Sequence, residues 1–208
     1  MAAASGRDRQ GERVIAGGES LGPTVKPAAR HRVRTGLRVV ERFFAIVGVC
    51  ALIYHLFFDF GVMVSSSMSP ALQGDNALTG DRVIFEKWTG LFRAPQRWEI
   101  HQFHTPEGLT VAKRVIGLPG ERVSLRKGLL CINGSPVAVP ERLKHLRYLP
   151  SGNLSKDREV ECGTGYYVLG DDSRDSWDSR YEGVLAADRF TGRAWLILGP
   201  RSHWGFVR

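Results

Sequence analysis

The sequence has few of the residues that mark disulfide scaffolds or metal centres. It contains three cysteines in 208 residues, Cys50, Cys131 and Cys162, and their spacing matches no metal-ligand pattern. Cys50 lies in an apolar run, whereas Cys131 and Cys162 are able to pair in an oxidising compartment or to stay unpaired in a core. The cysteines therefore predict no metal centre, and they leave the pairing of the last two open.

Net positive charge is small beyond the N-terminal region. The formal net charge is +8, but residues 1–42 hold nine Lys and Arg against four acids and account for +5 of it. The remaining 166 residues carry only +3, which is too little for the basic face of a nucleic-acid-binding domain. We therefore expect no nucleic-acid partner.

Long stretches of helical periodicity are absent beyond residue 62. The runs there are short and β-branched or aromatic, with Gly, Pro, Asn and Asp between them, as in "DRVIFEKW", "LTVAKRVIG" and "GRAWLIL". This pattern predicts one all-β domain over residues 62–208. Residues 1–36, in contrast, are rich in Ala, Gly, Arg and Pro with few large apolar residues, so we expect a disordered basic tail there.

One apolar run is long enough to suggest a membrane segment. The run "FFAIVGVCALIYHLFF", residues 43–58, carries no formal charge, and apolar neighbours extend it toward the roughly 20 residues that cross a bilayer. We predict a transmembrane signal anchor over residues 37–61, with a buried core helix as the alternative. Basic residues crowd its N-terminal flank, which predicts a cytoplasmic N-terminus and an exported remainder.

A histidine in a recognisable catalytic setting is also missing. Of the six histidines, His101 and His104 lie three apart in a predicted strand, so their rings point to opposite faces and do not suggest a metal pair. Lysine is the other candidate base. Lys113 follows Val111 and Ala112 in "VAKRVIG", where burial would lower its pKa from about 10.4 and leave the amine neutral. A solvated Lys–Arg pair in a strand is the alternative.

Two further segments carry clustered polar groups. The segment "MVSSSMSPAL", residues 63–72, follows the apolar run directly and is either a polar linker or a nucleophile segment that needs a base. The segment "GDDSRDSWDSRYEG", residues 170–183, puts Asp171, Ser173, Asp175 and Glu182 at the spacing of a calcium loop. Ser176 stands where such a loop has glycine, and a strand-like run precedes it, so we do not expect calcium.

Together, four segments resemble the sequence boxes of bacterial type I signal peptidases (leader peptidases). They are "SSSMSPAL", "GDRVIFEKW", "KRVIGLPGE" and "GDDSRDSWDSR", and they occur in the family's order and spacing over about residues 60–195. The resemblance implies a mainly β, antiparallel-sheet catalytic domain on one N-terminal transmembrane helix. It also implies a membrane-bound serine endopeptidase that cleaves signal peptides from secreted preproteins by a Ser–Lys dyad and an acyl-enzyme, without metal or other cofactor.

Carried over residue by residue, the resemblance makes Ser67 the nucleophile and Lys113 its general base. Ser65 matches the serine whose hydroxyl completes the oxyanion hole, and Ser176 matches the serine that orients the lysine amine. The supporting positions of the family are matched by Arg114, Asp171, Asp178 and Arg180, of which Arg114 is expected to pair with Asp171. The candidates for lining the shallow substrate pockets are Met63, Val64, Leu72 and Ala112.

The chain departs from the family pattern at several positions. Ala71 replaces a common Thr, Val64 a common Pro and Asp172 a common Asn, while Asp75 and Asp81 compete for one Gly-Asp position. These departures concern pocket shape and local packing, and none removes a catalytic group.

The resemblance further implies a single-pass protein of the bacterial inner membrane, with preproteins and the lipid bilayer, anionic lipids included, as partners. Self-cleaving repressors share the fold and a Ser–Lys pair, but they carry a DNA-binding domain where this chain has a tail and an anchor. Two alternatives stay open: a specialised maturation protease for one membrane or conjugation substrate, and a catalytically idle membrane-anchored scaffold. Intact Ser67 and Lys113 argue against the scaffold.

The segment "KWTGLFRAPQRW", residues 87–98, suggests a second membrane contact. It places Trp88, Leu91, Phe92 and Trp98 around a glycine-containing turn, with basic residues among them. Aromatic residues favour the membrane interface, and basic residues attract anionic lipid. We expect either a hairpin lip that dips into the headgroups or a cluster of core residues.

Overall fold

The computed structural model describes residues 27–207, and it describes side chains for residues 34–155 and 158–207. The chain divides into two compact units, residues 1–47 and 48–208, and each is described by itself.

The first described element is helix α1, Pro27–Phe57. Its segment Arg34–Phe57 has 24 residues with a mean hydropathy of 1.8 and is the one helix of the described chain that is long and apolar enough to cross a membrane. At 1.5 Å per residue it is about 36 Å long, which exceeds the bilayer core of about 30 Å. By length and composition, α1 therefore fits a membrane anchor.

The bounds of α1 differ from those predicted for the anchor, residues 37–61. Residues 27–36, predicted to be disordered, are helical; this stretch is rich in Ala and Arg, which are strong helix formers. The rest of the predicted tail, residues 1–26, lies outside the described residues. At the other end, Phe58–Val62 forms strand β1, because it pairs along its whole length with β2.

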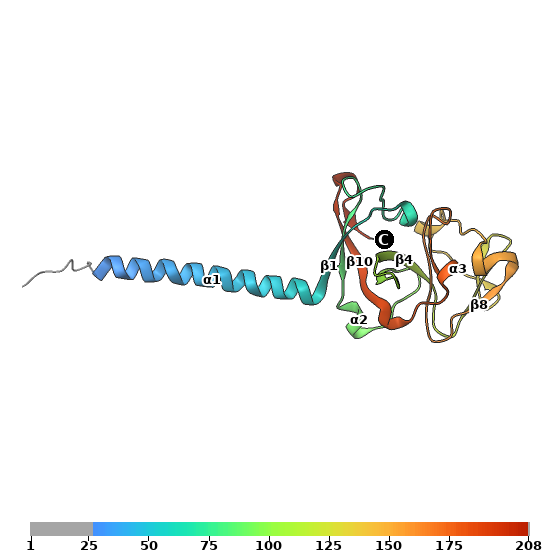
Figure 1. Cartoon of the computed structure of the whole chain (residues 1–208), viewed down its shortest axis with the longest axis horizontal. Helices are drawn as coiled ribbons and strands as arrows, with labels where there is room; N and C mark the ends of the chain where they lie inside the picture. Colours follow the sequence, from blue (N-terminus) through green and yellow to red (C-terminus); the bar gives the residue numbers. More distant parts are fainter. Residues whose placement is uncertain (1–26, 208) are drawn as a thin grey trace, which may run out of the picture. The chain divides into compact units, whose positions relative to one another are not determined.

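The second unit is built on two antiparallel sheets (Figure 1). The larger has the strand order β1-β2-β10-β3-β4-β9, with β11 added to β10, and the smaller has the order β7-β6-β5-β8. The strands are β1 Phe58–Val62, β2 Arg82–Glu86, β3 Ile100–His104, β4 Thr110–Gly117, β5 Arg122–Arg126, β6 Leu129–Ile132, β7 Ser135–Pro136, β8 Glu159–Glu161, β9 Tyr167–Leu169, β10 Phe190–Gly199 and β11 Gly205–Phe206. The predicted mainly β fold class is confirmed.

Two tight turns explain the meander of the smaller sheet. Lys127 and Gly128 join β5 to β6 with φ of 50° and 78°, and Asn133 and Gly134 join β6 to β7 with φ of 53° and 81°. Two consecutive residues at positive φ match the twist of a hairpin, and Asn-Gly is the preferred pair for such a turn.

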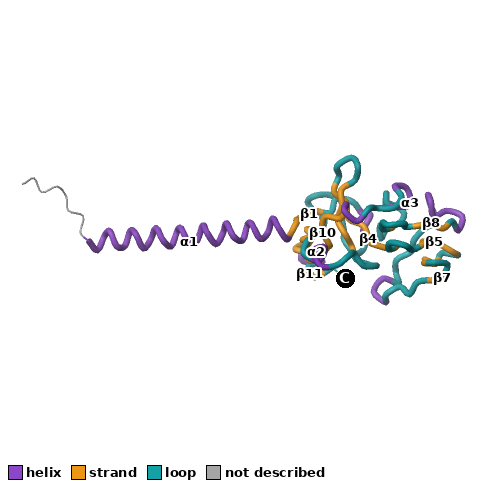
Figure 2. The backbone as a smooth tube through the Cα atoms, turned by 90° about the horizontal axis from the view of Figure 1, so that it is seen from below, coloured by secondary structure: helices purple, strands orange, loops and turns teal. Residues whose placement is uncertain are grey.

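The helices after β1 are short, as Figure 2 shows for α2, Thr89–Phe92, and α3, Ser179–Glu182. A single 3-10 turn, Ser66–Met68, lies between β1 and β2 in the chain. Met68 in this turn and Leu72 just after it are buried in a core cluster with Val83 and Phe85 of β2. Burying a side chain of this size stabilises the fold by roughly 1.5–3 kcal/mol, so the core itself fixes the segment that carries Ser67.

Candidate active site

Ser67 occupies the middle of the 3-10 turn and is largely buried, with 7% of its surface exposed. Its main-chain oxygen accepts a hydrogen bond from the N–H of Asp172 at 3.1 Å. The next residue, Met68, is 1% exposed in the core below. The serine is thus held from two sides by contacts that do not use its hydroxyl.

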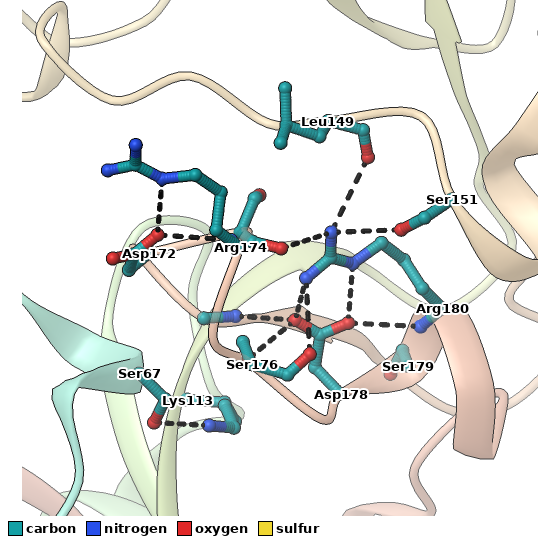
Figure 3. Close-up of polar contacts among 12 residues, drawn as sticks. Ser67, Lys113, Leu149, Ser151, Asp172, Arg174, Ser176, Asp178, Ser179 and Arg180 are labelled. Carbon is teal, nitrogen blue, oxygen red and sulfur yellow. Dashed lines mark hydrogen bonds and ion pairs between the residues drawn. The ribbon is translucent and has the colours of Figure 1, made fainter.

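Lys113 lies on β4 and points its amine at Ser67 (Figure 3). Its Nζ is 2.7 Å from Ser67 Oγ, and the residue is 3% exposed. Burial lowers the pKa of Lys113 from its ordinary value, while the charges of Asp178 and Glu182 oppose that shift. Burial disfavours the ammonium form, so the environment moves this lysine toward the neutral amine that can accept a proton.

The nearby cation that also lowers this pKa is Arg180. The side chain of Arg114, the residue after Lys113 on β4, binds elsewhere: Nε and Nη2 donate to the two oxygens of Asp171 at 2.7 and 2.6 Å, and Nη1 donates to the oxygen of Trp98 at 2.7 Å. The predicted Arg114–Asp171 pair is therefore present. Both side chains are almost fully buried, and the pair ties β4 to the loop that follows β9.

Ser65 lies beside the nucleophile position. Its Oγ is 3.1 Å from Ser67 Oγ, within hydrogen-bonding distance. Ser65 has extended backbone dihedrals and precedes the 3-10 turn. The two hydroxyls therefore share one side of the turn, where a hydroxyl group could donate to an oxygen bound next to Ser67.

The loop between β9 and α3 forms the opposite side of the site (Figure 3). Asp178 is its centre: the carboxylate accepts from Nε and Nη2 of Arg180 at 2.8 Å each, from Ser176 Oγ at 2.7 Å and from the N–H of Gly170 at 3.0 Å. Asp178 and Arg180 expose none of their side-chain surface. Arg180 also donates to main-chain oxygens, including Ser173 at 3.0 Å, so the loop is cross-linked internally.

Ser176, predicted to orient the lysine amine, is bonded within the loop, and that role stays a prediction. No hydrogen bond joins it to Lys113 among the described residues; its hydroxyl donates to Asp178 instead. The charged carboxylate is a stronger acceptor for a hydroxyl than an amine is. Ser176 reaches Lys113 only through Asp178, whose charge acts on the lysine.

The four candidate pocket residues separate into two groups. Leu72 and Ala112 are 0% and 5% exposed and belong to the core cluster that contains Met68. Met63 packs partly buried against the same cluster, and Val64 is 59% exposed. Leu72 is core because its side chain turns toward β2; Met63 and Val64, which directly precede Ser65, are the accessible members of the set.

The remaining metal-ligand candidates form no clustered ligand set among the described residues. Among residues 34–155 and 158–207, no group of three His, Cys, Asp or Glu side chains could hold a metal ion. Asp171, the first position of the supposed calcium loop, binds Arg114. His101 is buried against Glu99 whereas His104 is exposed, and Cys131 and Cys162 are unpaired thiols.

The segment 87–98 also separates into two parts. Leu91 and Phe92 of α2 are 70% and 83% exposed. Trp88 packs edge-on against Phe58 with ring centroids 4.9 Å apart. Trp98 packs against a different core cluster, so the exposed part of the predicted lip ends before it.

Three contributions at the site were not expected from the sequence, two from the main chain and one from a side chain. A Cβ on Gly170 would lie 2.1 Å from Ser176 Oγ and 2.6 Å from the oxygen of Ser67, so only glycine fits there. The N–H of Asp172 donates to the main-chain oxygen of Ser67, and the hydroxyl of Ser66 donates to the Asp175 carboxylate in the same β9–α3 loop. The glycine before Asp171 was the available signal, since a glycine without a turn requirement often marks a close approach of two backbones.

A serine hydroxyl beside a buried lysine amine pairs a nucleophile with a base, so the groups assembled here have the chemistry of a serine hydrolase. The family model described as signal peptidase, peptidase S26, matches residues 36–198. The chain is 30% identical over 172 residues to signal peptidase I of Bacillus caldolyticus, covering 79% of this chain and 92% of the relative. It is 34% identical over 151 residues to the probable signal peptidase I-1 of Synechocystis, covering 68% and 71%.

A solved structure of a signal peptidase I from Enterococcus faecalis shares 34% sequence identity and has a TM-score of 0.39, covering 49% of this chain and 97% of that one. The family match and the two relatives decide the assignment. The chain belongs to the signal peptidase family, peptidase S26, and is a protease of the signal peptidase I type.

Proposed function

We propose that the protein is a membrane-bound endopeptidase that cuts signal peptides from secreted preproteins with Ser67 as nucleophile and Lys113 as general base. The observation that carries the proposal is the 2.7 Å contact between Lys113 Nζ and Ser67 Oγ, with both groups buried. A serine needs a neutral base to remove its proton, and burial lowers the pKa of Lys113 toward that state.

In the first step, Lys113 takes the proton of Ser67 as Oγ attacks the carbonyl carbon before the cut. The oxygen of that carbonyl becomes negatively charged, and the hydroxyl of Ser65, 3.1 Å from Ser67 Oγ, donates to it together with the main-chain N–H of Ser67. Losing one donor of an oxyanion hole costs about 100- to 1,000-fold in rate.

In the second step, the lysine ammonium gives its proton to the departing amine, and Ser67 is left as an ester of the signal peptide. Neutral Lys113 then activates a water molecule, which hydrolyses the ester and restores the serine. Two buried ion pairs hold the walls of the site: Asp178 with Arg180, and Asp171 with Arg114. The proposed chemistry uses only groups of this chain.

The substrate is a preprotein still held in the bilayer by its signal peptide, and α1 anchors the enzyme in the same membrane. Nine Lys and Arg in residues 1–42 favour a cytoplasmic N-terminus by the positive-inside rule. This orientation puts the peptidase domain on the exported side of the bacterial inner membrane. Leu91 and Phe92, which are exposed, would contact the headgroups, anionic ones included.

The test uses the full-length protein in proteoliposomes with a model preprotein. We expect Ser67→Ala and Lys113→Ala each to lower the cleavage rate by at least about 1,000-fold, because a coupled nucleophile and base fail together. Lys127→Ala, which changes a hairpin lysine, is the control. Near-full activity in Lys113→Ala, or loss of activity in His101→Ala at unchanged stability, would refute the lysine base.

A further inference from the structure

Trp177 and Tyr181 form an exposed aromatic pair next to the catalytic groups. Their ring centroids are 4.6 Å apart and the rings are nearly parallel, with 12° between their planes. Trp177 is 68% exposed and Tyr181 46%. Two large aromatic rings that are stacked and left in solvent form an apolar surface, and such a surface often marks an interaction site.

The pair is held rigidly from below. Trp177 stands between Ser176 and Asp178, which are bonded to each other at 2.7 Å. The guanidinium of Arg180, fixed by Asp178 on one side, has its central carbon 5.8 Å from the centroid of the Tyr181 ring. A surface that is already ordered loses little conformational entropy when a ligand binds.

The pair is also close to the nucleophile. Gly170 is in contact both with the Ser176 side chain and with the main-chain oxygen of Ser67, since an added Cβ would lie 2.1 Å from the first and 2.6 Å from the second. Trp177 is the next residue after Ser176. An extended peptide advances about 3.3 Å per residue, so the first two or three residues after a cut at Ser67 would reach the segment that carries these rings.

Lys113 indicates which part of the substrate, before or after the cut, lies on the side of the aromatic pair. Under the proposed function the lysine delivers its proton to the departing amine, so the departing segment begins at the lysine amine. The acids whose charges act most on that amine, Asp178 and Glu182, belong to the same loop and helix as the aromatic pair. Met63 and Val64 lie on the other side of Ser67 in the chain, where the signal-peptide side would bind.

We propose that the Trp177–Tyr181 pair is a binding surface for the first residues of the mature protein, and that it favours an apolar or aromatic side chain at the second or third residue after the cut. This inference rests on the proposed function. A ring face that covers such a side chain removes apolar surface from water and adds a specific stacking contact.

The experiment compares peptides that share one signal-peptide cleavage region and differ only after the cut, with Leu or Phe against Gly at the second and third mature positions. The full-length protein is assayed in detergent, and kcat/KM is measured for each peptide. We expect the apolar peptides to be preferred roughly 3- to 10-fold, the size of an aromatic contact. Trp177→Ala should abolish the preference through KM, and Trp177→Phe should retain most of it.

Trp204→Ala, which removes a tryptophan ring of similar exposure, 70% against 68% for Trp177, is the matched control and should keep the preference. Cleavage of no peptide by the wild-type protein would contradict the proposed function. Cleavage with the same preference in wild type and Trp177→Ala would overturn the inference alone. An unchanged preference combined with weaker vesicle binding by Trp177→Ala would also overturn it, because lipid would then be the occupant.

Discussion

Gly170→Ala should lower the catalytic rate strongly, while its steric cost to stability is partly offset. The added methyl would lie 2.1 Å from Ser176 Oγ, 2.5 Å from Ser176 Cβ and 2.6 Å from the oxygen of Ser67, whereas ordinary contacts begin at 3.4 Å. A hydroxyl can rotate away, but a main-chain oxygen has to move, and 3.4 less 2.6 is 0.8 Å. The nucleophile turn and the β9–α3 loop are thus forced apart by nearly that distance.

A misplacement of about 1 Å in a catalytic group can cost about 100-fold in rate. We therefore expect Gly170→Ala to lower kcat/KM for a fluorogenic signal-peptide substrate by roughly 30- to 100-fold. Gly170 does not have positive φ, so backbone strain adds nothing, and alanine restricts the unfolded chain by about 0.4–1 kcal/mol, which offsets part of the steric cost.

Gly90→Ala is the matched control, because a Cβ there meets nothing within 4 Å and φ is not positive. Its activity and midpoint of thermal unfolding should equal or slightly exceed those of the wild type. Wild-type kcat/KM in Gly170→Ala would refute the argument that this close approach positions Ser67. A parallel loss in Gly90→Ala would show that the assay reports general damage.

Three further predictions concern pH, the buried pair and the lip. Activity should rise with pH through the pKa of Lys113, since the neutral amine is the active form. The midpoint should lie below the ordinary lysine value of about 10.4, because burial lowers that pKa. A pH profile governed by one group titrating near pH 4 would contradict this prediction. Asp171→Asn should lower the free energy of unfolding by about 3–5 kcal/mol, because Arg114 is left buried without its partner. Asp172→Asn is the control and should lower it by less than about 1 kcal/mol, because its partner Arg174 is exposed. Denaturant titration of both variants measures the difference, and equal values would contradict a special contribution of the buried pair. A domain that begins at Phe58, so that β1 is retained, should bind anionic liposomes. The double variant Leu91→Ser with Phe92→Ser should bind them more weakly at unchanged thermal stability, since these side chains are 70% and 83% exposed. Unfolding of the double variant would instead make them core residues.

The alternating and apolar patterns of the chain were enough to predict the β domain and the helix in front of it, and they made burial one of two alternatives for Lys113. Neighbours along the chain determine the first two properties. Whether Lys113 is buried depends on what covers its face of β4, because an antiparallel sheet can leave one face in water. The pairing of Arg114 with Asp171 was predicted from the family resemblance, and the structure contains it.

Only the tertiary structure decided which groups meet across loops. The hydroxyl of Ser176 bonds to Asp178 rather than to Lys113, Leu72 turns into the core instead of lining an open pocket, and Trp98 packs away from the lip. These outcomes depend on loop conformations that have no periodicity to read.

Gly170 makes the same point at the catalytic centre. Its place in the chain after β9 could be read from the residues, but the requirement for glycine arises because the turn carrying Ser67, more than 100 residues earlier in the sequence, comes within van der Waals contact of it. Local sequence determines which face a side chain takes on its own strand. The distance between two loops is set by the packing of all the strands that carry them, because the close-packed core fixes the positions of those strands.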